Sequence, residues 1–181
     1  MAVRKASAYS GKRARPFTRV SKTKHKAYIK VNPNNKIAKY QQGSGKDFRE
    51  GKHFFMVKLI AEQGVQIRDL ALEASRMFVT KMLESKFPGQ FYLRLKVYPH
   101  HLLRDNKTAA GAGADRLSTG MTHSYGIIAG RVAMVKPGKE IFTVSCTTDK
   151  VARIARDSLA KVKPKIPGRT RVSFEKIEVA K

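Results

Sequence analysis

Few residues in this 181-residue sequence have the types and spacing that catalysis or cofactor binding requires. The string GSGK at 43–46 resembles part of a phosphate-binding loop, but that motif would need Gly at Tyr40 and Ser or Thr at Asp47. Gly111 and Gly113 begin a dinucleotide-binding fingerprint whose third glycine is absent. The sequence therefore predicts no nucleotide cofactor.

The histidines, carboxylates and cysteine form no recognisable metal or nucleophile pattern. His100 and His101 are adjacent, so on a strand they would point to opposite faces and could not share a metal. The single cysteine, Cys146, rules out an internal disulfide and argues against a cysteine-based zinc site. Asp105 and Asp115 could be imagined as a nuclease-like pair, but a Gly-Ala loop supports catalytic geometry poorly. We expect no catalytic residue, metal, cofactor or small-molecule substrate, and hence no enzyme.

The dominant chemical property of the chain is its positive charge. Lys and Arg number 38 against 13 Asp and Glu, which gives a net charge of +25. Such a charge favours a polyanionic partner, with nucleic acid the first candidate and an anionic membrane the second. No apolar run approaches the ~20 residues of a membrane-spanning helix, and the N-terminus turns basic at once. We therefore expect a soluble, intracellular protein, and of the two polyanions we expect nucleic acid and no membrane as the partner.

The N-terminal part of the chain concentrates this charge. Residues 1–46 contain 13 Lys and Arg and no Asp or Glu, with aromatic residues spaced among them. Cations can pair with phosphates while aromatics stack on exposed bases, so we interpret residues 1–50 as an extended RNA-binding arm with a flexible joint at 41–47. The alternative is a solvated, non-specific tail. The expected RNA contacts in the arm are Arg4, Lys12, Arg13, Arg15, Arg19, Lys22, Lys24, Lys26 and Tyr28.

A second unusual stretch, residues 104–121, has no apolar period and is longer than ordinary connections. Its glycines free the backbone for close approach to another surface, and its basic side chains add cationic reach. We interpret it as a displayed loop, with a passive linker as the alternative. The residues on which this interpretation depends are Arg104, Lys107, Gly111, Gly113 and Arg116.

Between and after these stretches, residues 51–181 have the periodicity of one folded domain. A strand is predicted at 53–62, and a strand at 91–99 should point Arg94 and Lys96 to an outer, RNA-facing side. A helix is predicted over 64–86, and its expected apolar face comprises Ile67, Leu70, Ala71, Ala74, Phe78 and Met82.

The C-terminal half should supply the remaining elements. A hairpin turning at Pro137–Lys139, a helix that begins near Thr148 and stops at Pro164, and a last strand at 170–180 are predicted. The order β-α-β, loop, β-β-α-β indicates an α+β fold with two helices packed on one face of a mixed or antiparallel sheet.

Four strings in the sequence resemble one protein family. They are RLKVYPHHLLRDNK (94–107), GAGADRLSTGM (111–121), GRVAMVKPGKEIFTV (130–144) and KIPGRTRV (165–172). Together they look like the large-subunit ribosomal proteins called L-ten-e in archaea and eukaryotes and L-sixteen in bacteria. The string GADRLSTGM sides with the archaeal and eukaryotic branch, and the absence of a Cys- and Tyr-rich opening favours an archaeal type.

The resemblance implies an α/β-hammerhead-like fold with a long central loop. It also implies binding to large-subunit rRNA near the A-site tRNA and the peptidyl transferase region, with the loop at 104–121 approaching tRNA and neighbouring ribosomal proteins as further partners. Arg169 and Arg171 would contact rRNA. Two other classes stay open from the residues alone: an architectural DNA-binding protein and an RNA nuclease or modification enzyme.

Overall fold

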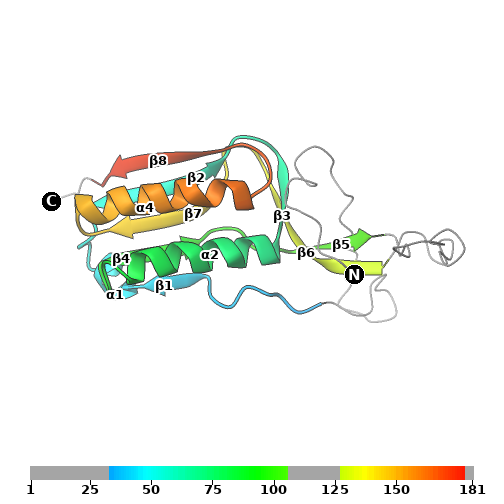
Figure 1. Cartoon of the computed structure of the whole chain (residues 1–181), viewed down its shortest axis with the longest axis horizontal. Helices are drawn as coiled ribbons and strands as arrows, with labels where there is room; N and C mark the ends of the chain where they lie inside the picture. The colour runs from blue at the N-terminus through cyan, green and yellow to red at the C-terminus, as the bar shows by residue number, and fades with distance from the viewer. Residues whose placement is uncertain (1–32, 106–126, 178–181) are drawn as a thin grey trace, which may run out of the picture.

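The computed structural model describes residues 33–105 and 127–177. These form a five-stranded sheet of order β1-β4-β7-β2-β8 and a three-stranded sheet of order β3-β6-β5, and adjacent strands pair antiparallel. Two long helices lie side by side on one face of the larger sheet (Figure 1). The predicted α+β class with two helices on one sheet face is confirmed, and the sheets are antiparallel rather than mixed. The elements are β1 (Gln41–Gly43), α1 (Gly45–Arg49), β2 (Phe55–Ala61), β3 (Val65–Arg68), α2 (Asp69–Glu84), β4 (Phe91–Leu95), β5 (His101–Asp105), β6 (Ile127–Val135), β7 (Glu140–Cys146), α4 (Asp149–Val162), η3 (Lys163–Lys165) and β8 (Thr170–Lys176).

The core lies between the larger sheet and the helices. Along β2, alternate residues point toward the helices, and Val57, Leu59 and Ala61 are fully buried. From the other side α4 contributes Val151 and Leu159, which are also fully buried. Burying one such side chain stabilises a fold by about 1.5–3 kcal/mol, so this layer explains why the helices stay on the sheet.

The helix predicted over 64–86 is in fact a strand followed by a helix. Residues Val65–Arg68 form β3, which pairs with β6, and α2 begins only at Asp69. All four residues of β3 are buried, so the apolar period that predicted a helix reflects a strand covered on both faces. Ile67 therefore belongs to the smaller sheet.

The apolar face predicted for this helix is right only in part, because Ala71 and Phe78 pack against the core but the rest of the face does not match. Leu70 is exposed, whereas Ser75, Arg76 and Thr80 point inward. Each inward polar group has a partner: Ser75 Oγ donates to the Ala71 carbonyl, and the other two bond to side chains nearby. Hydrogen bonding permits these polar residues to be buried. A helix face predicted from apolar residues alone is therefore shifted by about one residue from the face that is buried.

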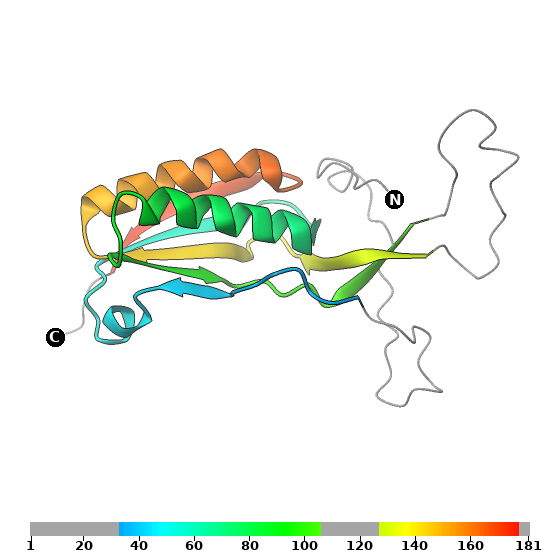
Figure 2. The same cartoon turned by 60° about the horizontal axis from the view of Figure 1, so that its bottom comes forward.

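The predicted turn at Pro137–Lys139 is present, but it does not close a hairpin. Strand β6 pairs with β3 and β5 in the smaller sheet, while β7 pairs with β2 and β4 in the larger one. The turn instead bonds to β2, because Gly138 N–H donates to the Ala61 carbonyl and Ala61 N–H donates to the Lys139 carbonyl. The chain passes repeatedly between the sheets, from β2 to β3, through α2 to β4, from β4 to β5 and from β6 to β7. The smaller sheet projects beyond the helices (Figure 2).

The flexible joint predicted at 41–47 is an ordered part of the domain. Gln41–Gly43 form β1 on the edge of the larger sheet, and Ser44 caps α1 by accepting a hydrogen bond from the Asp47 N–H. Further upstream, Ile37 is buried in the main core. Residues 33–50 therefore pack on the domain, whereas residues 1–32 of the predicted arm lie outside the described residues. The division into arm and domain stays a prediction, as do the hammerhead likeness and the long loop.

Candidate nucleic-acid interface

The sheet face opposite the two helices, here called the outer sheet face, carries the basic strand residues that the sequence singled out. Along β4 and the residues that follow it, Leu93, Leu95 and Val97 are buried, while Arg94 and Lys96 between them are exposed. The predicted alternation is confirmed.

Lys96 belongs to a network of ion pairs on this face. It bonds to Glu140 of β7, and Glu140 also contacts Lys58 of β2 at 3.3 Å. Lys58 in turn bonds to Glu175 of β8 at 2.6 Å. The hydrogen bond from Lys96 and then that from Lys58 lower the pKa of Glu140, and the bond to Glu175 raises the pKa of Lys58. Two lysines and two glutamates cancel, so the network is electrically neutral and leaves Arg94 beside it as an exposed cation.

Aromatic rings flank Arg94 and Lys96 on both sides along the chain. At one end Phe48 of α1 stacks on Tyr92, with ring centroids 4.9 Å apart, and covers it. At the other end Tyr40 stacks on Tyr98 at 5.5 Å, and His100 lies 4.4 Å from Tyr98. Tyr98 is 42% exposed, so this end offers an aromatic surface to which an unpaired base could stack.

The segment 33–40 is held at the junction between the two sheets. Arg131 Nε of β6 donates to the Pro33 carbonyl at 2.7 Å, and the Lys36 N–H donates to Asp69 at the start of α2. Asn35 donates to the Tyr40 hydroxyl. The described chain thus begins beside the smaller sheet, and that sheet also carries the ends of β5 and β6 that flank residues 106–126 (Figure 2).

The C-terminal part of the domain has more net positive charge per residue than the rest of the described chain. Residues 149–177 contain nine Lys and Arg and three Asp and Glu, hence +6 over 29 residues, whereas residues 33–105 need 73 residues to reach the same +6. Arg169 and Arg171, at the turn before β8 and within it, are both exposed. Their positions are compatible with the predicted rRNA contacts.

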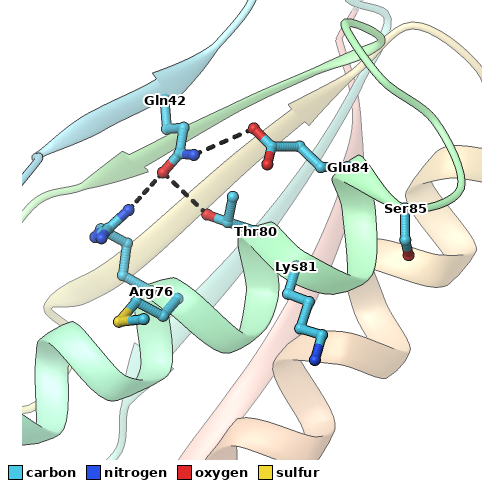
Figure 3. Close-up of a pocket in the computed structure, with 7 residues that line it drawn as sticks. Gln42, Arg76, Thr80, Lys81, Glu84 and Ser85 are labelled. Atoms are coloured by element: carbon cyan, nitrogen blue, oxygen red, sulfur yellow. Dashed lines mark hydrogen bonds between the residues drawn. The ribbon is translucent and has the colours of Figure 1, made fainter.

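An open groove on α2 contrasts with that basic region. Gln42 of β1 lies at its centre, where its amide oxygen accepts hydrogen bonds from Arg76 and Thr80 and its amide nitrogen donates to Glu84 (Figure 3). Because Arg76 is also paired with Glu73, the groove residues satisfy one another and tie the edge strand β1 to the helix. The geometry indicates a structural role for this cluster.

The described residues contain no evident catalytic constellation. Within residues 33–105 and 127–177, no three His, Cys, Asp or Glu side chains gather closely enough to hold a metal. Cys146 is buried, and burial raises the pKa of its thiol to about 12, so it is a poor nucleophile. Burial likewise lowers the pKa of His53 and of His101. No helix in this part of the chain is long and apolar enough to cross a membrane.

The predicted site residues fall into two groups. Arg94, Lys96, Arg169 and Arg171 are in the described domain, on the outer sheet face or around β8. Arg104 lies in β5, opposite Ile128. The other predicted contacts lie outside the described residues: Arg4, Lys12, Arg13, Arg15, Arg19, Lys22, Lys24, Lys26, Tyr28, Lys107, Gly111, Gly113 and Arg116.

Sequence reasoning missed two exposed arginines of α4, Arg153 and Arg156, and the exposed ring of Phe174. The three-residue spacing of the arginines on the polar side of a predicted helix could have indicated them.

Taken together, these features describe a basic α+β protein whose described part presents charged and aromatic surfaces and no catalytic constellation. Residues 15–173 match the model of the family described as Ribosomal protein L16p/L10e. The chain therefore belongs to this ribosomal protein family.

Archaeal relatives span nearly the whole chain. The large ribosomal subunit protein uL16 of Pyrobaculum calidifontis is 38% identical over 177 residues, covering 97% of this chain and 95% of the relative. That of Archaeoglobus fulgidus is 36% identical over 163 residues, with 90% and 87% covered, and that of Staphylothermus marinus is 34% identical over 179 residues, with 98% and 97% covered. These matches confirm the archaeal-type resemblance and, because the relatives are named as ribosomal subunit proteins, the prediction that the chain is not an enzyme.

Proposed function

We propose that this chain is a structural constituent of the cytoplasmic large ribosomal subunit, where it binds rRNA and neighbouring ribosomal proteins and serves translation. The observation that carries this proposal is its family membership, since relatives matched over nearly their full length are named as large-subunit proteins. The +25 charge supports rRNA as the main partner, because lysines and arginines displace counterions from phosphates.

We also propose a position for the chain in the subunit. The chain binds rRNA near the A-site tRNA and the peptidyl transferase region, and its segment 104–121 approaches tRNA. Two features support this. The strands that flank the segment project away from the helical layer (Figure 2), and the segment itself is rich in Gly and Ala, which permit close approach to another surface.

Replacing residues 106–115 by a short Gly-Ser linker tests the role of this segment. The β5–β6 ladder ends at the Asp105–Ile127 pair, so the replacement leaves the paired residues intact. Loop closure varies by only about 0.6 kcal/mol per doubling of length, so the melting temperature should change by only a few degrees. Large subunits that carry the variant should bind A-site tRNA more weakly than wild-type subunits.

Three other outcomes have distinct meanings. A large fall in melting temperature would place the segment in the folded core. Normal stability with normal tRNA binding would identify it as a passive linker. Failure of the wild-type chain to enter large subunits, with co-sedimentation on DNA after RNase treatment, would instead support the architectural DNA-binding class.

A further inference from the structure

A small groove lies between α4 and β8, away from the outer sheet face. It is lined by Asp149, Arg153, Arg156 and Phe174 and has a volume of about 260 Å³. That is below the ~300–1,000 Å³ typical of sites for whole drug-sized ligands, so it suits a single ring system. The Phe174 ring is 44% exposed and lies against the Phe55 ring in a tilted arrangement, with centroids 5.9 Å apart.

The polar groups around this ring are suited to a nucleotide. Arg153 Nε donates a hydrogen bond to Asp149 at 2.8 Å. This bond holds the Arg153 guanidinium beside the groove and uses one of its five donors. Among residues 33–105 and 127–177, the contacts of Arg156 are long ones, of 3.4 Å, with Asp157. Arginines recognise phosphate, a carboxylate accepts from a base amino group or a ribose 2′-hydroxyl, and an exposed aromatic ring stacks on a base.

The surrounding charge favours RNA over a basic protein segment as the occupant. The stretch 149–177 carries +6, so a basic protein extension would be repelled while a phosphate backbone would be attracted. We propose that the groove between α4 and β8 binds one unpaired rRNA nucleotide, with its base stacked on Phe174 and its phosphate held by Arg153 and Arg156. This inference rests on the proposed rRNA-binding function and assigns it a specific site.

Salt dependence separates the two kinds of contact in the full-length chain bound to large-subunit rRNA. Each phosphate contact contributes about 0.7–0.9 to the slope of log K against log salt, so changing both Arg153 and Arg156 to Gln should flatten it by about 1.4–1.8. The matched control changes two exposed lysines of the other helix region, Lys81 and Lys86, to Gln. If the two arginines form a site, this control should flatten the slope less than the double arginine variant does.

Changing Phe174 to Leu tests the stacking contact. Leucine keeps an apolar contact with Phe55 but has no ring, so affinity should fall about 5- to 150-fold, equivalent to about 1–3 kcal/mol of stacking, with an unchanged salt slope. The variant Phe174→Trp, which keeps an aromatic ring, should retain the wild-type affinity. The control is Phe54→Leu, because Phe54 is equally exposed (45%) but lies outside the groove. Ultraviolet cross-linking should also attach a nucleotide to the wild-type peptide that contains Phe174.

The outcomes distinguish this site from the broader function. If wild-type protein binds rRNA but Phe174→Leu binds equally well, or no more weakly than Phe54→Leu, the nucleotide site is refuted and rRNA binding stands. If Phe174→Leu binds isolated rRNA normally but is lost from assembled subunits, the groove holds a protein segment and the proposal is also refuted. If the wild-type chain shows no salt-dependent rRNA binding, the proposed function itself fails.

Discussion

Changing Glu140 to Gln should weaken the fold while strengthening RNA binding, because Glu140 is the acid that neutralises Lys96. Glu140 bonds to Lys96 and contacts Lys58, and its side chain is 25% exposed. Lys58 keeps Glu175 as a second partner, so the substitution mainly releases Lys96. The ion-pair network on the outer sheet face then changes from neutral to a net charge of +1.

Both effects can be estimated from these contacts. Ion pairs at partly exposed sites contribute about 0.2–1 kcal/mol each, so losing two should cost about 1 kcal/mol, or roughly 2–4 °C in melting temperature for a chain of this length. If the released Lys96 pairs with a phosphate, the slope of log K against log salt should become steeper by about 0.7–0.9. Because the ion pairs lower the pKa of Glu140 in the folded state, their stabilisation is present above its ordinary pKa and is lost as the pH falls through the lowered one. The stability difference between the proteins should therefore be full at pH 7 and disappear in acid.

Thermal unfolding and filter binding to large-subunit rRNA at several salt concentrations measure the two effects. Glu175→Gln is the matched control, since it removes one acid from the same face but leaves Lys96 paired with Glu140. A slope that steepens equally in both variants would mean that net charge alone matters. An unchanged slope in Glu140→Gln would refute the prediction that Lys96 contacts rRNA.

Three further predictions concern the fold. Gly168→Ala should destabilise the domain by about 2–4 kcal/mol in thermal unfolding, because Gly168 has φ +78° and an added Cβ would lie 2.4 Å from Val65 Cγ1. The control Gly138→Ala has a similar φ of +79° but open space around it, so it should cost only about 1–2 kcal/mol. Equal costs for the two variants would contradict the packing argument. His53→Gln should reduce the stability lost between pH 7 and pH 5, because burial lowers the pKa of His53 and the unfolded chain takes up the proton first; an unaltered pH profile would show that His53 is not responsible. Cys146 should react with a thiol reagent about a thousandfold more slowly in the native protein than in denaturant, because burial raises the pKa of its thiol from an ordinary 9.0 to about 12 and so lowers the thiolate fraction. Rapid labelling of the native protein would show that the strand opens locally.

Sequence periodicity predicted elements well where a single face is buried. The alternation around Arg94 was right because one side of β4 meets the helices and the other does not. Periodicity failed at Ile67, because a strand buried on both faces has no alternation to detect. It also failed at Thr80, a polar residue that can be buried because its hydroxyl donates a hydrogen bond to Gln42. A turn motif also could not show which sheet the strand after Lys139 would join.

The candidate interface was predictable only in part, because charge in the sequence is not the same as charge available at the surface. Arg94 and Lys96 have the same sequence signal, but only Lys96 bonds to Glu140, a residue 44 positions away. Pairings of that kind depend on the strand order β4-β7-β2-β8, which the sequence did not define. The groove at Phe174 likewise needs α4 to lie against β8.

The position of β2 affects how the chain is made. Both of its sheet neighbours, β7 and β8, are synthesised after it, and the Lys58–Glu175 bond joins residues 117 positions apart. During synthesis β2 therefore emerges with two unpaired edges, and the larger sheet is completed only once β8 is available. Contacts so distant in sequence form slowly. A newly made chain thus exposes an apolar strand and a highly basic N-terminal segment together, the combination that favours aggregation with nucleic acid before folding is complete.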